Sequence, residues 1–160
     1  RQLKLKNLKV KLYMIGGGRY KSRLQKLVSI SGLNSQMIFI DYQDLSSVYS
    51  YSLNADFLFL SLKNEEIFAH TLPAKLQTYM SLGKPILGMI SGEANKLINE
   101  SNIGIAVDSG DYIKLANEIK NILNNKYDKN IMTLNSSALY DKKFKSSFRK
   151  KQIIKLIKSI

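Results

Sequence analysis

The sequence has 160 residues, enough for one compact domain with an appended tail, and a domain of this size buries about 70% of its unfolded surface. It contains no cysteine, which excludes a disulfide framework, thiolate metal sites and a thiol nucleophile, and which fits a cytoplasmic protein. No apolar run approaches the roughly 18 residues that a membrane span requires.

The net charge of +13 comes from the two ends of the chain. Residues 1–26 carry nine Lys or Arg and no acid, and residues 142–160 carry eight and no acid, whereas the middle holds all twelve acids and only eight basic residues. Nucleic-acid-binding proteins more often interleave basic with aromatic residues along a groove or helix. We therefore expect a lysine-rich solvated surface and no nucleic-acid partner.

Five short apolar runs alternate with helical patterns along the chain. The strands are predicted at Val10–Ile15, Gln36–Ile40, Asp56–Leu62, Pro85–Ile90 and Gly104–Val107. The helices are predicted at 19–32, 45–53, 73–83, 93–101 and 111–125. Strict alternation of this kind predicts an α/β fold with a Rossmann-like open parallel sheet.

Several details of these elements can be predicted from residue type. Asp44 or Ser46 is expected to cap the third element's following helix, and Gly32 and Gly83 to end helices. Pro73 is expected in the first turn of its helix, after an irregular loop from Lys63 to Thr71. Helical spacing places a further set of apolar residues on inward faces, namely Leu24, Leu27, Val28, Ile30, Val48, Tyr49, Leu53, Ile113, Leu115, Ala116, Ile119, Ile122 and Leu123.

The character of the sequence changes after Asn125, where it becomes polar and weakly periodic. We therefore divide the chain into a ligand-binding domain, residues 1–125, and a basic helical tail, residues 126–160. In the tail, one helical face carries apolar residues opposite lysines, namely Ile153, Leu156, Ile157 and Ile160. The sequence begins at Arg1 within a basic stretch, and we interpret it as part of a longer protein.

Open parallel sheets bind ligands at the carboxyl ends of their strands. The ligand-binding residues are therefore expected in the loops 16–20, 41–46, 62–73 and 91–95. Gly16-Gly17-Gly18 follows a strand and precedes a helix, where backbone N–H groups favour an anion. It fits neither the dinucleotide fingerprint nor a P-loop, so a simple tight turn remains an alternative.

Longer motifs resemble the group 1 (family 4) retaining glycosyltransferases. "LYMIGGG" is similar to that family's strand and glycine turn, and "NADFLFLSL" to its strand ending in a small polar residue. "MSLGKPIL", from Met80 to Leu87, resembles the family pattern Ala-x-Gly-x-Pro-Val. The preceding "LPAKL" resembles the fucosaminyltransferase-like branch, and "NIGIAVDSGDYIKLANEIKNIL" the close of the domain. The resemblance covers about residues 9 to 124.

The resemblance implies the donor-binding half of a two-domain (GT-B) enzyme that transfers a sugar from a nucleotide sugar, UDP-linked, to a polysaccharide or lipid-linked acceptor. The acceptor domain would lie in an absent N-terminal part, so the isolated chain would be inactive. The implied nucleotide-sugar-binding residues are Gly16, Gly17, Gly18, Asp41, Tyr42, His70, Thr71, Leu72, Lys75 and Thr78. No catalytic residue can be assigned, and no cofactor is expected beyond the donor.

Lys75 is the most informative of these residues. A lysine in the first turn of a helix opposes the helix dipole unless an anion lies nearby, although its side chain could instead bend to solvent. The family carries two glutamates seven residues apart; here their positions fall on His70 and Thr78. Thr78 would bind a ribose hydroxyl more weakly than a carboxylate does.

Three further expectations complete the prediction. A single histidine and the absence of an Asp-x-Asp pair after a strand predict no metal site. The basic tail, residues 142–160, is predicted to bind an anionic membrane surface, which would place the protein at the inner face of the membrane. A nucleotide-sugar epimerase and a receiver-like signalling domain remain alternatives, the second opposed by glycines where receiver acids would stand.

Overall fold

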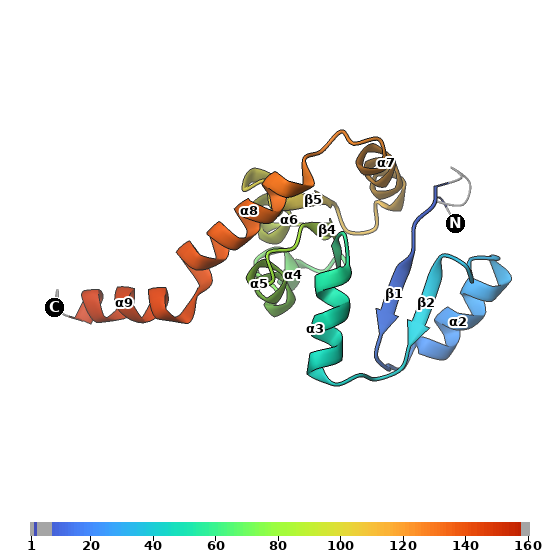
Figure 1. The fold of residues 1–160 in the computed structure, drawn as a ribbon, viewed down its shortest axis with the longest axis horizontal. Helices are drawn as coiled ribbons and strands as arrows, with labels where there is room; N and C mark the ends of the chain where they lie inside the picture. Colours follow the sequence, from blue (N-terminus) through green and yellow to red (C-terminus); the bar gives the residue numbers. More distant parts are fainter. Residues whose placement is uncertain (1, 3–7, 158–160) are drawn as a thin grey trace. The chain divides into compact units, whose positions relative to one another are not determined.

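The computed structural model describes residue 2 and residues 8–157. It divides into two compact units, Arg1–Tyr51 and Ser52–Ile160 (Figure 1). Each unit contains parallel strands connected by helices, which confirms the predicted α/β class. The separate division of the chain at residue 125 stays a prediction.

The first unit is built on one pair of parallel strands. Its elements are β1 (Leu12–Ile15), α2 (Lys21–Ile30), β2 (Met37–Ile40) and α3 (Leu45–Asn54), the last of which continues into the second unit. The register runs from Leu12 opposite Met37 to Ile15 opposite Ile40. Two of the predicted helix signals are confirmed, because α2 ends before Gly32 and the Asp44 carboxylate accepts the Ser47 N–H at 2.7 Å at the start of α3.

The inward faces predicted for α2 and α3 are only partly correct. Val28 is buried, but Leu27 and Ile30 are exposed, and so are Tyr49 and Leu53 of α3. The physical reason is the size of the sheet. A helix that packs on two strands can bury only a narrow apolar stripe, because there is little sheet surface to cover.

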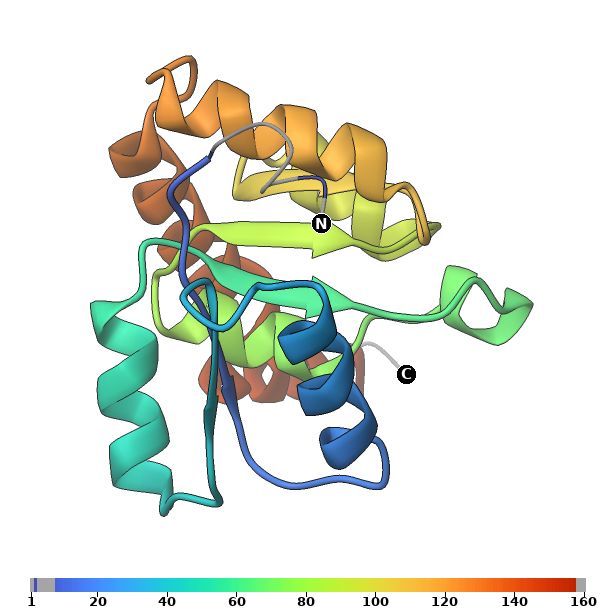
Figure 2. The ribbon, with the colours of Figure 1, turned by 90° about the vertical axis from the view of Figure 1, so that its right-hand side faces the viewer.

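The second unit contains a three-stranded parallel sheet in the order β3-β4-β5. Its elements are β3 (Leu58–Ser61), α4 (Glu66–Ala69), α5 (Ala74–Ser81), β4 (Ile86–Met89), α6 (Glu93–Glu100), β5 (Gly104–Val107), α7 (Tyr112–Leu123), α8 (Lys129–Leu139), the π-helical turn η1 (Tyr140–Phe144) and α9 (Ser146–Ile157). In Figure 2 the strand arrows of β3 and β4 point toward the end of the unit where α4 lies.

The main hydrophobic core belongs to the second unit. It joins the sheet to the helices that connect its strands, and consists of Leu60, Leu76, Met80, Ile86, Ile90, Ala94, Ile98, Ile103 and Ala106. Every residue of β5 is buried, as expected for a strand covered on both faces.

Four sequence-based expectations for this unit are wrong. The loop Lys63–Thr71 contains the short helix α4, and Pro73 is the residue before α5 rather than part of its first turn. Ile113 and Leu123 of α7 are exposed, because α7 meets the sheet along β5 and its buried face is narrow, with Ala116 at its centre.

The tail begins with a helix that belongs to the core of the unit. α8 contacts α5 and β5, and its Met132 and Ser136 are buried. η1 and α9 follow it along the chain. On the predicted apolar face of the tail, Ile160 lies outside the described residues, as do the side chains of Ile153 and Leu156.

Candidate functional site

The glycine turn of the first unit connects β1 to α2. The Gly16 N–H donates to the Ile40 carbonyl at 3.0 Å, and the Lys21 N–H donates to the Gly18 carbonyl at 3.1 Å. A Cβ atom added to any of the three glycines would meet no atom within 4 Å. The turn therefore exposes its backbone at the carboxyl end of β1, where a ligand could approach closely.

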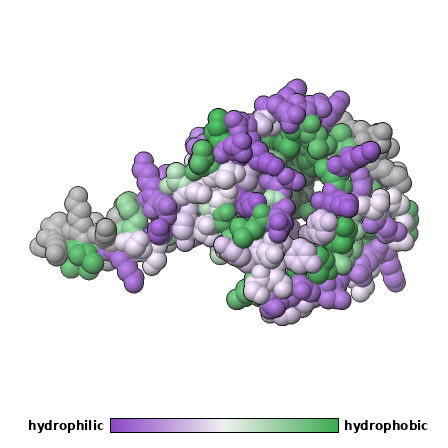
Figure 3. All heavy atoms as spheres, in the orientation of Figure 1, coloured by the Kyte–Doolittle hydropathy of each residue, from purple (hydrophilic) through white to green (hydrophobic). Residues whose placement is uncertain are grey.

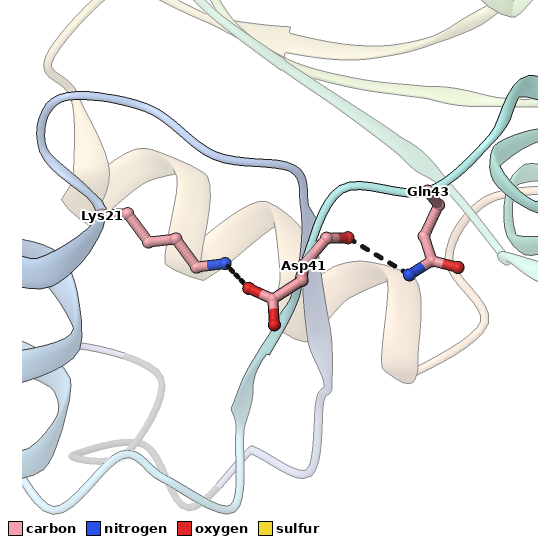
Figure 4. Close-up of polar contacts among 3 residues, drawn as sticks. All are labelled: Lys21, Asp41 and Gln43. Carbon is pink, nitrogen blue, oxygen red and sulfur yellow. Dashed lines mark hydrogen bonds and ion pairs between the residues drawn. The ribbon is translucent and has the colours of Figure 1, made fainter.

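An ion pair spans the carboxyl ends of β1 and β2 (Figure 4). Lys21, in the first turn of α2, places its Nζ 2.5 Å from Oδ1 of Asp41, the residue that follows β2. The hydrogen bond and the positive charge of Lys21 hold the pKa of Asp41 below its usual range. The Gln43 amide donates a long hydrogen bond of 3.4 Å to the Asp41 carbonyl, and the side chain of Tyr42 is exposed.

In the second unit, a hollow of about 420 Å³ lies at the carboxyl ends of the three strands. It is lined by Ser61, Leu62, Lys63, Asn64, Met89, Ser109 and Gly110. Its position agrees with the predicted involvement of the loop 62–73. None of the lining residues is among the ten predicted from the sequence.

Two contacts fix the loops around this end of the sheet. The Ser91 N–H donates to the Ser109 hydroxyl at 3.1 Å, and the Ser109 N–H donates to the Ser91 hydroxyl at 3.0 Å. Gly92, with φ of 75°, packs so closely against α4 that a Cβ there would lie 2.0 Å from the Ala69 carbonyl oxygen. The loops after β4 and β5 and the short helix α4 are thus held against one another.

His70, Thr71 and Leu72 connect α4 to α5. His70 ends α4, and its side chain is exposed. The Thr71 hydroxyl donates to the Ile67 carbonyl at 3.3 Å, while Leu72 is partly exposed. The three residues leave the carboxyl end of β3 together, which is the position that the sequence predicts for them.

Helix α5 begins at the same end of the sheet, because it follows β3 and returns the chain to the start of β4. No side chain caps its first turn in the described structure, and Lys75 lies there with its side chain exposed. The Thr78 hydroxyl donates to the Ala74 carbonyl one turn earlier, at 3.3 Å. This bond turns the threonine toward its own helix.

The Gly83-Lys84-Pro85 motif lies at the opposite, amino end of β4 and performs a structural role. Lys84 donates from Nζ to the Ala55 carbonyl at 3.0 Å, and its own carbonyl accepts the buried Ser136 hydroxyl at 3.2 Å. Gly83, with φ of 62°, ends α5, and a Cβ there would lie 2.5 Å from the Ser137 hydroxyl oxygen. The motif is therefore the surface on which α8 packs.

Two searches of the described residues returned nothing. They contain no group of three or more His, Cys, Asp or Glu side chains placed to hold a metal ion. Within the same part of the chain, none of the helices combines the length and the apolar content that crossing a bilayer requires.

The family is decided by comparison with known proteins. The sequence profile of the family described as "Glycosyl transferases group 1" matches residues 1–137. The chain belongs to the group 1 glycosyltransferases. No curated protein matches the sequence.

Solved structures resemble this group 1 glycosyltransferase domain in fold. Anabaena HepE in complex with UDP matches with a TM-score of 0.76 and 17% identity, over 94% of this chain and 41% of that one. TarM of S. aureus, in complex with fondaparinux, alpha-GlcNAc-glycerol and UDP, matches with 0.69 and 14%, over 95% and 30%. The pneumococcal O-GlcNAc transferase GtfA, in complex with UDP and GlcNAc, matches with 0.68 and 16%, over 98% and 31%.

The chain thus spans between about a third and two fifths of these structures. Their fold confirms the Rossmann-like architecture of the GT-B type, as the sequence predicts. The ten predicted site residues are divided between the units, five in the first and five in the second. Their roles stay predictions.

Sequence reasoning missed Lys21 and the serine pair Ser91 and Ser109. For Lys21 a signal existed, since it stands three residues after Gly18 and Asp41 follows the next strand. Parallel neighbouring strands bring such opposite charges to the same edge.

Proposed function

We propose that this group 1 glycosyltransferase domain binds the nucleotide-sugar donor of a retaining, two-domain enzyme. The observation that carries the proposal is the placement of the glycine turn and of the α5 N-terminus, each at the carboxyl ends of the strands of its own unit. These ends are where open α/β sheets bind nucleotides, and helix N-termini favour phosphate groups.

The donor is proposed to be a UDP-sugar. Support comes from similar structures solved with UDP, with UDP-glucose, and with UDP and GlcNAc. Lys75 would contribute a positive charge to the diphosphate, and the glycine turn would contribute backbone N–H groups. No cofactor is proposed, because the leaving diphosphate would be stabilised electrostatically by these groups.

The acceptor is proposed to be a polysaccharide or a lipid-linked sugar, bound by a further domain of the same protein. Support comes from the length of the similar structures, of which this chain covers 41% or less. We also retain the fucosaminyltransferase-like branch as a proposal, on "LPAKL" before the α5 motif. The basic tail would hold the enzyme at the inner face of a membrane.

Calorimetry with UDP, GDP and ADP tests the donor proposal on the full chain. We expect UDP to bind and no sugar to be transferred, because the acceptor domain is not included. Absence of binding by all three nucleotides would remove donor binding from this chain. Measurable transfer to an acceptor would instead contradict the proposal that the chain is half of an enzyme.

A further inference from the structure

The Asp41 carboxylate occupies a defined place in the first unit. Gly16 donates to the carbonyl of Ile40, so the glycine turn lies directly beside the residue that precedes Asp41. Lys21 approaches from α2 and holds Oδ1 at 2.5 Å, as Figure 4 shows. The glycine turn and the carboxylate therefore lie together at one edge of the β1–β2 pair.

The ion pair orients the carboxylate without covering it. The Lys21 side chain is only 20% exposed, whereas the Asp41 side chain is 95% exposed. An ionised carboxylate can accept about four hydrogen bonds. In the described structure its side chain accepts one, from Lys21, so capacity remains for a ligand that donates hydroxyl groups.

The second unit has no carboxylate at the position where the family carries the ribose-binding glutamate. Thr78 stands there, and its hydroxyl donates to the Ala74 carbonyl of its own helix. A ribose diol binds best to an ionised acceptor, since hydrogen bonds to charged groups are the stronger ones. Such an acceptor has to come from elsewhere in the chain.

We propose that the Asp41 carboxylate, oriented by Lys21, accepts the ribose hydroxyl groups of the donor nucleotide. In doubly wound nucleotide-binding folds an acidic residue about 20 residues beyond the glycine turn binds the ribose. Asp41 stands 23 residues after Gly18 and follows the second strand, as that role requires. The inference rests on the proposed donor binding and assigns one of its contacts.

The alternative is that Lys21 and Asp41 form only a surface ion pair, which fastens α2 to the end of β2. The chain offers a matched control for this reading. Asp56 forms a second exposed pair, with Lys129 at 2.5 Å, ahead of β3 at the amino end of its strand. Asp56→Asn therefore removes the same kind of ion pair away from the carboxyl edge.

The test compares UDP with 2′,3′-dideoxy-UDP by calorimetry on the full chain. We expect the unmodified protein to bind UDP roughly tenfold to hundredfold more tightly than the dideoxy compound. Asp41→Asn should bind UDP only as well as the dideoxy compound, whereas Asp56→Asn should keep the full preference. Far-UV circular dichroism of each variant verifies that it is folded.

The possible failures are distinct. Equal binding of the two nucleotides by the unmodified protein overturns the ribose contact and leaves donor binding intact. A preference that survives in Asp41→Asn assigns the diol to another residue and overturns the inference. If neither nucleotide binds the unmodified protein, donor binding fails and the ribose contact fails with it.

Discussion

Ser91 and Ser109 exchange hydrogen bonds, each backbone N–H donating to the hydroxyl of the other at 3.1 and 3.0 Å. The first serine follows β4 and the second follows β5, so the pair joins the two loops at the carboxyl end of the sheet. Ser109 also lines the hollow there. The pair therefore acts as a brace for the wall of that hollow.

Replacing either serine by alanine leaves the N–H of the other without its acceptor. We expect Ser91→Ala and Ser109→Ala each to lower the free energy of unfolding by about 0.5–1.5 kcal/mol. The double variant should cost less than the two single costs together, because both bonds belong to one reciprocal unit. Urea-induced unfolding measures these values, with Ser22→Ala of the exposed face of α2 as control. Strictly additive costs would mean that the two bonds are independent.

The Gly83 turn should tolerate a side chain poorly. An alanine there would hold φ of 62° and place its Cβ 2.5 Å from the Ser137 hydroxyl oxygen. We expect Gly83→Ala to lower the free energy of unfolding by about 1–2 kcal/mol, mainly through the left-handed backbone. Adding Ser137→Ala removes the overlap but not the backbone strain, so it should restore only part of the loss. Gly17→Ala, which meets no atom within 4 Å, is the control.

Periodic and strongly apolar elements could be predicted from the sequence, because local signals determine them. β5 was predicted with its observed bounds, since Gly104–Val107 lies between clear turn residues. α8 was not assigned as a separate helix. Its fully buried residues are Met132 and Ser136, and a buried serine gives no apolar signal. Its position depends on the Gly83 turn and on Lys84, which are distant in sequence.

The same distinction applies to the candidate site. The glycine turn and Lys75 could be found because strand–turn–helix order is visible in the sequence. The contact between Lys21 and Asp41 depends on the parallel register of β1 and β2, which no local pattern reveals. The internal bond of Thr78 is likewise invisible, because a threonine hydroxyl in a helix can bond its own backbone or a ligand.

Lys75 should contribute to the binding of phosphate rather than of the nucleoside. If its ammonium group faces the diphosphate, Lys75→Ala should weaken UDP binding by about 1.5–3 kcal/mol, the range for hydrogen bonds to charged groups. Uridine, which has no phosphate, should bind the variant and the unmodified protein alike. Calorimetry measures both, with Lys120→Ala in the last turn of α7 as control. An equal loss for uridine would point to a disturbed helix.

The Lys21 side chain should set the ionisation of Asp41. Its hydrogen bond and charge lower the pKa of Asp41, so the pair stabilises the fold above the usual aspartate pKa of about 4. That stabilisation is lost as the pH falls through the lowered pKa. Lys21→Met should raise the pKa of Asp41 toward the usual value, as carboxyl ¹³C chemical shifts can follow.

Asp44 is the internal reference for this titration. Its pKa is lowered by hydrogen bonds from the Ser47 N–H and the Ser46 hydroxyl, and it should not respond to Lys21→Met. Unchanged titration of Asp41 in the variant would show that Lys21 does not hold the carboxylate in solution. A shift of both aspartates together would show a general disturbance of the first unit.

The basic tail should bind an anionic membrane surface. Residues 142–160 carry eight Lys or Arg and no acid, and Ile154 and Ile157 of α9 are exposed. On the face shown in Figure 3, hydrophilic and hydrophobic side chains both lie along this part of the chain. Each basic residue near an anionic surface gains about 1 kcal/mol within a Debye length, whereas packing on protein would gain little from so many lysines.

Liposome sedimentation of the full chain and of a chain ending at Asp141 measures this contribution. We expect the full chain to sediment with anionic vesicles at low salt, and not with neutral vesicles or at high salt, because screening weakens the attraction. The shortened chain keeps α8, which packs on α5 and β5, so the core of the second unit stays intact. It should remain in the supernatant under all conditions. If it sediments as well as the full chain does, the tail is structural, and the basic residues of the first 26 positions become the membrane-binding candidate.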